Sequence, residues 1–226
     1  PYELDEFAPQ AAIEAAIHEV NRDENVHGCL LFRPLPSFVD ESHMCELLDP
    51  KKDIDGITLA SLASVFTDGH AGYPPATAAA CIQLLDHYQV PLQGKHVVVV
   101  GRSLVVGKPV SMMLLRRNAS VTICHSKTEN LADIMRSADV VICATGRART
   151  FGAQFFGPGQ TVLDVGINFD TNDWFAFDVK SGADDYGEYL ASTGSRDAVV
   201  TYTNIDDKPL DGEARKYCLV RVWTPA

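Results

Sequence analysis

The sequence predicts an α/β protein built on a doubly wound parallel sheet, accompanied by a second, smaller α/β lobe. From residue 96 onward, short apolar runs alternate with helical patterns, as expected of parallel strands joined by helices. Four consecutive valines at residues 97–100 indicate a strand that is buried on both faces. A glycine-containing turn at residues 101–107 follows this strand and opens a helix. A helix N-terminus placed there binds anions, so the pattern predicts a site for a phosphate-bearing dinucleotide.

Composition limits the class of protein to which the chain can belong. Its 226 residues are 46% hydrophobic and 22% charged, which is typical of a globular protein with a buried core. The net charge of -11 argues against general affinity for nucleic acid or for anionic membranes. The apolar runs are shorter than a membrane span, and the first residues lack the order of a signal peptide.

The cysteines give a further indication of compartment. The six cysteines are scattered and form no C-x-x-C pair, so the pattern gives no support to a zinc site. Several lie within apolar, strand-like runs, which favours buried reduced thiols over disulfides. We therefore expect a cytoplasmic protein without a metal ion.

The first part of the chain predicts helices and one short strand. Apolar residues recur at helical spacing over residues 11–20, and an apolar run over residues 27–32 predicts a strand that ends before Pro34. A second helix is expected over residues 41–48. Thr77 is the expected N-cap of a third helix, whose apolar face carries Cys81, Ile82, Leu85 and Tyr88.

The second part of the chain is more regular. We expect strands over residues 96–100, 120–124, 140–144 and 161–165, and helices over residues 109–117 and 130–136, with Pro109 in a first helical turn. From Asp170 onward the periodicity fades into acidic, glycine- and tyrosine-rich sequence. The expected domains are residues 1–89, residues 90–205 and a divergent tail at residues 206–226.

Ligands of doubly wound sheets bind outside the carboxyl ends of the strands. In this sequence these ends carry residues 101–103, 125–126, 145–146 and 166–168. Four strand ends that meet in one crevice are stronger support for a binding site than any single motif.

The end of the second strand indicates which dinucleotide is bound. An acidic residue there would hold the ribose 2′-hydroxyl of NAD, but the chain has Cys124-His125-Ser126-Lys127. Ser126 and the nearby Arg102 favour a 2′-phosphate and hence NADP. The alternative is that Arg102 and Lys127 are solvated surface residues. His125 is either a catalytic base or a structural residue with a minor cofactor contact.

A second charged cluster lies at residues 51–56. Asp53 and Asp55 are two positions apart, so on extended backbone they point to opposite sides and do not form an acid–base pair. One of them could face a pocket while the other braces the turn, or the cluster could be an ordinary charged turn. The residues alone thus predict an NADP-binding α/β protein without an identified substrate.

Several segments, in this order, resemble the bifunctional methylenetetrahydrofolate dehydrogenase/cyclohydrolase family. Residues 26–36 look like the family's HGILVQLPLP segment, residues 52–56 match its K-D-[VI]-D-G motif, residues 75–77 resemble its P-C-T, residues 98–109 are close to its VVVGRSxxVGxP, and residues 164–168 match its D-V-G-I-N. The resemblance covers about residues 1–170.

The resemblance implies a folate-binding lobe and a Rossmann-like NADP-binding lobe. It implies oxidation of 5,10-methylenetetrahydrofolate by NADP⁺ and hydrolysis of the methenyl product to 10-formyltetrahydrofolate. Asp55 would contact the pterin ring, whereas the cofactor would be held by Gly101, Arg102, Ser103, Ser126 and the backbone of Ile167. Family membership further implies a homodimer and a place in one-carbon metabolism and purine biosynthesis, with no nucleic-acid or membrane partner.

The chain departs from the family pattern in three places. The family's Tyr-x-x-x-Lys catalytic motif belongs to an N-terminal segment that would precede Pro1, so part of the first lobe is expected to be missing. Phe32 stands where the family has glutamine. After Asp170 the family's proline–glycine loop and final helix have no counterpart. If the chain is complete as written, we expect impaired activity.

Two other functions remain open from the sequence. One is a catalytically impaired homologue that still binds NADP and folate. The other is an NADP enzyme that uses this scaffold for a non-folate substrate.

Overall fold

The computed structural model describes residues 3–5, 7–147, 149–166, 168–169, 175–176 and 221–223. The chain divides into two compact units, residues 1–79 and residues 80–226. The boundary expected from the sequence, between residues 89 and 90, lies further along the chain. Among the described residues, no helix has the length and the apolar character that a membrane crossing requires.

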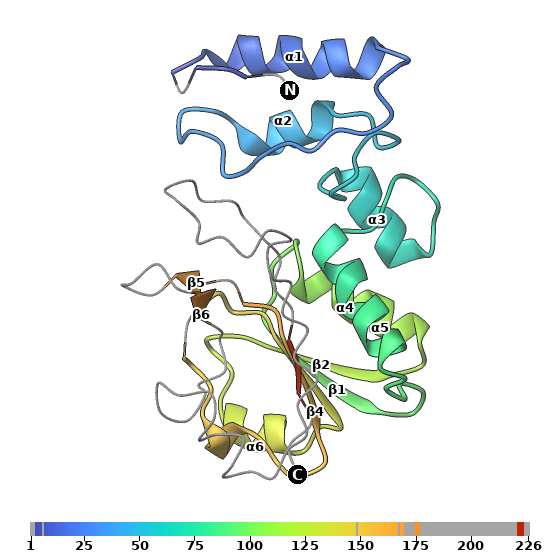
Figure 1. Ribbon diagram of the computed structural model, residues 1–226, viewed down its shortest axis with the longest axis vertical. Coiled ribbons are helices and arrows are strands. Elements are labelled where there is room, and N and C mark those ends of the chain that lie inside the picture. The colour runs from blue at the N-terminus through green and yellow to red at the C-terminus, as the bar shows by residue number, and fades with distance from the viewer. Residues whose placement is uncertain are drawn as a thin grey trace, which may run out of the picture. The chain divides into compact units, whose positions relative to one another are not determined.

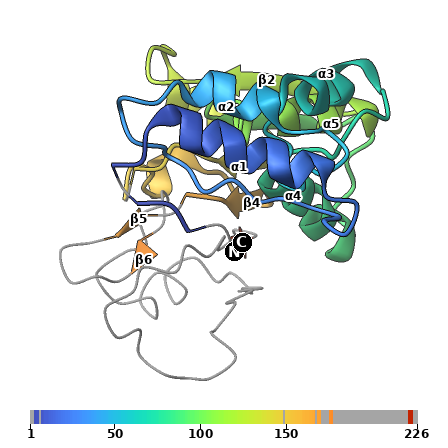
Figure 2. The same cartoon turned by 90° about the horizontal axis from the view of Figure 1, so that it is seen from above.

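The first unit contains three helices, α1 (Gln10–Arg22), α2 (Glu41–Leu47) and α3 (Leu59–Thr67). Helices α1 and α2 run side by side, as Figure 2 shows. Ile13, Ile17 and Val20 of α1 are buried against Met44 of α2 and Leu48. This packing confirms the two helices predicted over residues 11–20 and 41–48.

Side-chain caps set the start of two of these helices. The Asp40 carboxylate accepts the His43 N–H at 3.0 Å where α2 begins. Thr58 caps α3 in the same manner, because its hydroxyl oxygen accepts the Ser61 N–H at 3.2 Å. Each cap satisfies one of the N–H groups that a helix start leaves without an intrahelical acceptor. Helix α3 was not predicted from the sequence.

The prediction of a strand over residues 27–32 is wrong. Within this segment only Cys29 pairs with another residue, in an isolated parallel bridge to Asp53, and the Cys29 N–H donates to the Lys52 carbonyl at 2.6 Å. A strand requires a continuous ladder to a neighbouring strand, and the described residues of this unit provide one bridge. The apolar run therefore forms extended chain, on which Leu30 and Phe32 are exposed.

The second unit is built on a sheet with the strand order β2-β1-β3-β4-β7. The first four strands are parallel and match the predicted ones to within one residue, which confirms the α/β fold; β7 pairs antiparallel to β4 at the edge. Their bounds are β1 (His96–Val100), β2 (Ser120–Cys124), β3 (Val140–Cys143), β4 (Thr161–Asp164) and β7 (Arg221–Trp223). The central strands are buried on both faces.

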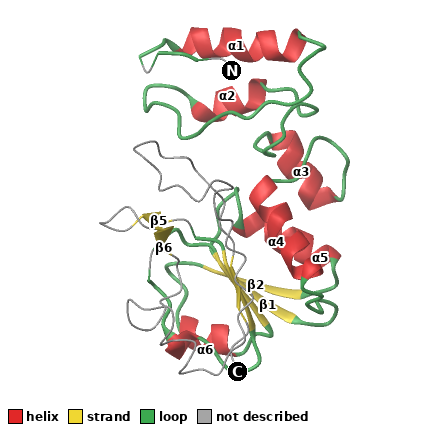
Figure 3. Ribbon diagram, in the orientation of Figure 1, coloured by secondary structure: helices red, strands yellow, loops and turns green. Residues whose placement is uncertain are grey.

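Helices lie on both sides of this sheet, as Figures 1 and 3 show. Helix α6 packs on the face that carries Val98 and Val100, and α5 contacts β1 and β2 from the opposite side. The helices of this part are α4 (Ala76–His87), α5 (Gly107–Arg116), α6 (Leu131–Arg136) and the short 3₁₀ turn η1 (Ala153–Phe155). Because α4 begins at Ala76, Thr77 is its second residue, and the prediction that Thr77 is the N-cap is wrong.

Little of the tail is described. Strands β5 (Asn168–Phe169) and β6 (Phe175–Ala176) pair antiparallel in a separate two-stranded sheet. Strand β7 comes from the tail that the sequence treats as divergent, and its backbone closes the edge of the main sheet. The remaining residues from Asp170 onward, where the departure from the family pattern was expected, lie outside the described residues.

Candidate functional site

The chain leaves β1 at Gly101 and turns into α5 over residues 101–106. Gly101 has a φ of 140°, and a Cβ placed on it would lie 2.4 Å from the Ala144 carbonyl oxygen. A Cβ on Gly107 would lie 2.1 Å from the Gly101 carbonyl oxygen. Both positions therefore require glycine, because the turn after β1 touches the end of β3 and the start of α5. The turn brings the N-terminus of α5 to the carboxyl end of β1.

Arg102 and Ser103 are exposed on this turn. The Ser103 hydroxyl oxygen accepts the Val106 N–H at 3.1 Å, and its carbonyl oxygen accepts the Lys108 N–H at 3.0 Å. Ser103 thus orders the approach to α5. The exposed Arg102 guanidinium adds positive charge beside a helix N-terminus, where the helix dipole already favours anions.

A second turn follows β2. The His125 N–H donates to the Thr128 hydroxyl at 2.9 Å, and the Lys127 N–H donates to Nδ1 of His125 at 3.1 Å. These contacts make His125 part of the turn, and they leave Ser126 and Lys127 exposed. Residues 124–128 include no carboxylate.

These two turns lie at the crevice that the sheet topology defines. In the sheet, β2 lies on one side of β1 and β3 lies on the other. The strand order therefore reverses between β1 and β3, which is the topological switch point where doubly wound sheets bind ligands. The backbones meet there, because the Ala144 N–H donates to the Val100 carbonyl and the Gly101 N–H donates to the Cys124 carbonyl, each at 2.9 Å. The structure therefore brings Gly101, Arg102 and Ser103 close to the strand end that precedes Ser126. Ile167, the remaining predicted cofactor residue, lies outside the described residues.

In the first unit, Asp53 forms the centre of a buried turn. It is 0% exposed, and its two carboxylate oxygens accept the Ile57 N–H at 3.0 Å, the Thr58 N–H at 2.8 Å and the Ser61 hydroxyl at 2.7 Å. Burial alone would raise the pKa of Asp53. The three donated hydrogen bonds outweigh burial, so the pKa lies below its ordinary value. Asp53 is therefore a structural carboxylate that fixes the start of α3.

Asp55 lies on the same turn but remains accessible, with a side chain that is 28% exposed. Its Oδ2 atom is 3.7 Å from Nη2 of Arg33, whose Nη1 atom is 3.8 Å from Oε1 of Glu41. Burial raises the pKa of Asp55, whereas the Arg33 guanidinium opposes this rise and the Asp53 charge adds to it. The pKa of Asp55 therefore lies above its ordinary value, although Arg33 favours the ionised carboxylate.

The other residues of the K-D-I-D-G motif shape the turn. Gly56 has a φ of 67°, and a Cβ on it would lie 2.4 Å from the backbone nitrogen of Pro75. Lys52 extends to the end of α1, where its ammonium group donates to the carbonyls of Val20 at 2.7 Å, Asn21 at 3.1 Å and Asp23 at 2.7 Å. The motif thus has one accessible carboxylate, Asp55, surrounded by residues with structural roles.

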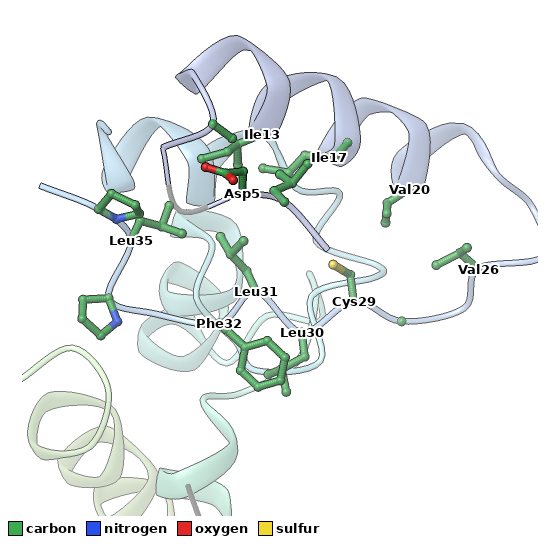
Figure 4. A pocket seen from close by; sticks show the side chains of 16 residues that line it. Asp5, Ile13, Ile17, Val20, Val26, Cys29, Leu30, Leu31, Phe32 and Leu35 are labelled. Atoms are coloured by element: carbon green, nitrogen blue, oxygen red, sulfur yellow. The ribbon is translucent and has the colours of Figure 1, made fainter. Parts of the chain in front are cut away.

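The first unit also contains an apolar cavity of about 510 Å³, shown in Figure 4. It is lined by aliphatic side chains of α1, such as Ile13 and Ile17, and by residues of the extended segment 26–36. Among the described residues of its lining, Asp5 is the one carboxylate, and neither Arg33 nor Asp55 belongs to them. The cavity has few of the polar groups that a pterin ring would need.

Sequence reasoning left open which of Asp53 and Asp55 braces the turn. In the structure Asp53 is buried and accepts the hydrogen bonds of the turn, whereas Asp55 is accessible. Sequence reasoning overlooked Arg33, which lies 22 positions from Asp55 in the sequence but contacts it in the fold. The position of Arg33 next to the Phe32 substitution was the available signal. Among the described residues, no three His, Cys, Asp or Glu side chains gather into a possible metal site.

Comparison with known families covers both units. The sequence profile described as tetrahydrofolate dehydrogenase/cyclohydrolase, catalytic domain, matches residues 1–55. The profile described as the NAD(P)-binding domain of the same family matches residues 75–191.

Curated relatives and solved structures agree with these profiles. The chain is 46% identical over 169 residues to the bifunctional protein FolD of Carboxydothermus hydrogenoformans, covering 75% of this chain and 59% of that protein. It is 49% identical over 155 residues to FolD of Shouchella clausii, covering 68% of this chain and 55% of that protein. The chain thus spans less than two thirds of the length of these relatives.

Among solved structures, the FolD methylenetetrahydrofolate dehydrogenase/cyclohydrolase of Campylobacter jejuni superposes with a TM-score of 0.77 at 34% identity, covering 79% of this chain and 64% of that one. The Trypanosoma brucei enzyme complexed with NADP cofactor and an inhibitor gives a TM-score of 0.73 at 30% identity, covering 78% of this chain and 63% of that one. With both of its units matched, the chain belongs to the tetrahydrofolate dehydrogenase/cyclohydrolase family.

Proposed function

We propose that this chain acts in the NADP-dependent oxidation of 5,10-methylenetetrahydrofolate to the 5,10-methenyl form and in the hydrolysis of that form to 10-formyltetrahydrofolate. One observation carries the proposal: the Gly101 turn lies at the switch point of the sheet, beside a β2 end without a carboxylate. The first feature fits a dinucleotide pyrophosphate and the second fits a 2′-phosphate. Family membership supplies the folate substrate.

In the second unit, Gly101 and Ser103 would hold the cofactor through the turn backbone, together with the backbone of Ile167. Arg102 and Ser126 would bind the 2′-phosphate, since a guanidinium and a hydroxyl both donate to phosphate oxygens. When bound, NADP⁺ supplies the acceptor for the hydride that leaves the methylene carbon of the substrate. The contribution of these residues is to fix the position of the acceptor, which lowers the entropic cost of the transfer.

In the first unit, Asp55 would bind the pterin ring of the folate. Its ionised carboxylate accepts hydrogen bonds from the amino group and the ring N–H of a pterin, a pairing that two parallel acceptor oxygens suit well. The hydrogen bonds to Asp53 hold the turn on which Asp55 lies. This arrangement orients the substrate and requires no change in the protonation of Asp55 during the reaction.

A catalytically impaired NADP- and folate-binding homologue is the second candidate. Phe32 favours it, because this side chain stands where the family has a polar glutamine and is 77% exposed. A phenyl ring cannot replace the hydrogen bonds of an amide. Turnover measured with 5,10-methylenetetrahydrofolate, in parallel with the binding of both ligands, separates the two candidates.

We further propose a homodimer in the cytoplasm that contributes to one-carbon metabolism and purine biosynthesis. The thiols of Cys29, Cys45 and Cys124 are free, and burial raises the pKa of each. Protonated, unreactive thiols of this kind fit a reducing compartment. Sedimentation equilibrium of the purified chain tests the dimer, and a monomer at all concentrations would contradict it.

The test of the cofactor site is a titration of the 226-residue chain with NADP⁺ and with NAD⁺. We expect NADP⁺ to bind more tightly, and Arg102→Ala to reduce this preference by about tenfold or more through the loss of charged hydrogen bonds. Lys108→Ala is the matched control, because it removes an exposed cation from the same region without changing the 2′-phosphate contacts. Equal binding of the two cofactors by the unaltered chain would overturn the assignment to NADP.

A further inference from the structure

Arg33 is a residue of this chain that the family pattern does not explain. The family segment H-G-I-L-V-Q-L-P-L-P has leucine at this position, whereas the chain has a guanidinium that lies 3.7 Å from the Asp55 carboxylate. The Arg33 side chain is 24% exposed, so a ligand that contacts Asp55 has access to both groups. The pair thus presents an anionic acceptor and a cationic donor next to each other.

The position of Arg33 is fixed from its other side. Oε2 of Glu41 accepts the Leu35 N–H at 2.9 Å, which orients this carboxylate, and Oε1 lies 3.8 Å from Nη1 of Arg33. The guanidinium therefore lies between two carboxylates, one held by the backbone and the other accessible. An arginine held in this manner loses less conformational entropy when a ligand binds to it.

The chemistry of a pterin edge matches this arrangement. Along its pyrimidine ring, a pterin carries an exocyclic amino group, a ring N–H and a carbonyl oxygen, which are two donors followed by an acceptor. A carboxylate can accept from both donors, and an adjacent guanidinium can donate to the carbonyl. We propose that Arg33 is a substrate-binding residue that donates to the pterin carbonyl while Asp55 accepts from the neighbouring N–H groups. This inference rests on the folate function proposed above.

The proposal makes Arg33 a determinant of specificity for 4-oxo over 4-amino pteridines. A 4-amino group places a donor where Arg33 also donates, so the contact is lost and two donors face each other. A site in which two donors are forced to face each other discriminates more strongly than one that only loses surface contact. A structural role for Arg33 gives no reason for such discrimination.

The test compares folic acid with its 4-amino analogue aminopterin, which differ in the substituent at position 4 and, with it, in the proton on the neighbouring ring nitrogen. The second difference alters the contact with Asp55, which is the same in every Arg33 variant, so the change of the ratio between variants isolates Arg33. Calorimetric titration is carried out on the full chain, at a pH where the pteridine rings of both ligands are neutral. We expect the unaltered chain to prefer folic acid, and Arg33→Leu to reduce the ratio of the two dissociation constants by about tenfold or more. Arg33→Lys retains a donor and is expected to keep part of the preference.

Lys51→Leu is the matched control, because it removes an exposed cation from the same unit and is expected to leave the ratio unchanged. If Arg33→Leu does not fold, Arg33→Gln provides a neutral donor in its place and is expected to give an intermediate ratio. An unchanged ratio in a folded Arg33 variant that still binds folic acid would overturn this inference alone. Binding of neither pteridine by the unaltered chain would overturn the folate function, and the inference with it.

Discussion

The two candidate binding regions, one in each unit, are held in shape by different parts of the polypeptide. At the turn after β1, the backbone itself determines the geometry: Gly101 and Gly107 allow a close approach that no side chain could share. At the turn around Asp53, one carboxylate accepts three hydrogen bonds and thereby fixes the backbone. The comparison predicts that adding a side chain damages the region shaped by the backbone, whereas removing a side chain damages the region shaped by the Asp53 carboxylate.

The largest expected effect tests the region held by side chains. Asp53→Ala leaves the Ile57 and Thr58 N–H groups and the Ser61 hydroxyl without their buried acceptor. We expect the free energy of unfolding to fall by about 4 kcal/mol, because several buried donors lose a charged partner at once. Urea denaturation measures this loss.

Asp40→Ala is the control for this variant, since Asp40 accepts one exposed N–H at the start of α2. Loss of this cap is expected to cost about 1 kcal/mol. Equal losses of unfolding free energy in the two variants would show that the Asp53 carboxylate stabilises the protein no more than an ordinary helix cap does.

The next effect tests the backbone-determined region. Gly101→Ala adds a Cβ 2.4 Å from the Ala144 carbonyl oxygen, at a φ of 140°. Strain and overpacking together are expected to lower the free energy of unfolding by about 3 kcal/mol and to weaken NADP⁺ binding.

Gly94→Ala serves as its control. Gly94 also has a positive φ, 74°, but no atom lies within 4 Å of the added Cβ, so the expected cost is about 1 kcal/mol from backbone strain alone. A stable Gly101→Ala variant with unchanged NADP⁺ affinity would contradict the close approach on which the comparison depends.

Acidification is expected to affect the Asp53 turn more than the sheet. Since the folded-state pKa of Asp53 is below its ordinary value, its stabilisation is complete above about pH 4 and is lost as the pH falls through the folded-state pKa. Asp139, at the start of β3, also has a lowered pKa because the His96 N–H and Lys95 donate to it, but this carboxylate is far more exposed. Below pH 5, the melting temperature should therefore depend less on pH in Asp53→Asn than in Asp139→Asn. The reverse order would contradict the assignment.

The smallest effect concerns Asp55, whose pKa is raised by burial. Above its folded-state pKa the ionised carboxylate costs stability, because the folded protein binds a proton more readily than the unfolded chain does. Asp55→Asn is expected to raise the melting temperature slightly at pH 7 while folate binding is lost. A lower melting temperature, with folate binding retained, would show that Asp55 is structural, as Asp53 is.

The sequence predicted the second unit better than the first, for a physical reason. Parallel strands buried on both faces leave uninterrupted apolar runs, so the strand at residues 97–100 and its neighbours were recognised within one residue. Residues 27–32 have the same apolar pattern, but no neighbouring strand pairs with them continuously. Whether a neighbouring strand is present depends on the whole fold and cannot be read from the local sequence. Helix α3 was missed although Thr58 provides its cap, because the helix is short and two of its large apolar residues, Leu59 and Phe66, are exposed.

The candidate site residues differ in the same way: those close together in the sequence were predictable, and those brought together by packing were not. Gly101, Arg102 and Ser103 are consecutive, so their common location on one turn was predictable. The contact of Arg33 with Glu41 and Asp55 depends on how separate segments pack, and the burial of Asp53 depends on donors that lie four to eight residues further along.

Lys52 has a consequence for the lifetime of helix α1. Its ammonium group binds three carbonyls at the C-terminal end of that helix, where positive charge complements the helix dipole. Lys52 precedes Asp53 directly, and Asp55 follows on the same short turn. This one segment therefore opposes both the fraying of α1 and the loosening of Asp55, the carboxylate proposed to bind the substrate. Amide hydrogen exchange at the end of α1 is therefore expected to slow when a pterin binds to Asp55, so that this helix end would report occupancy of the proposed folate site.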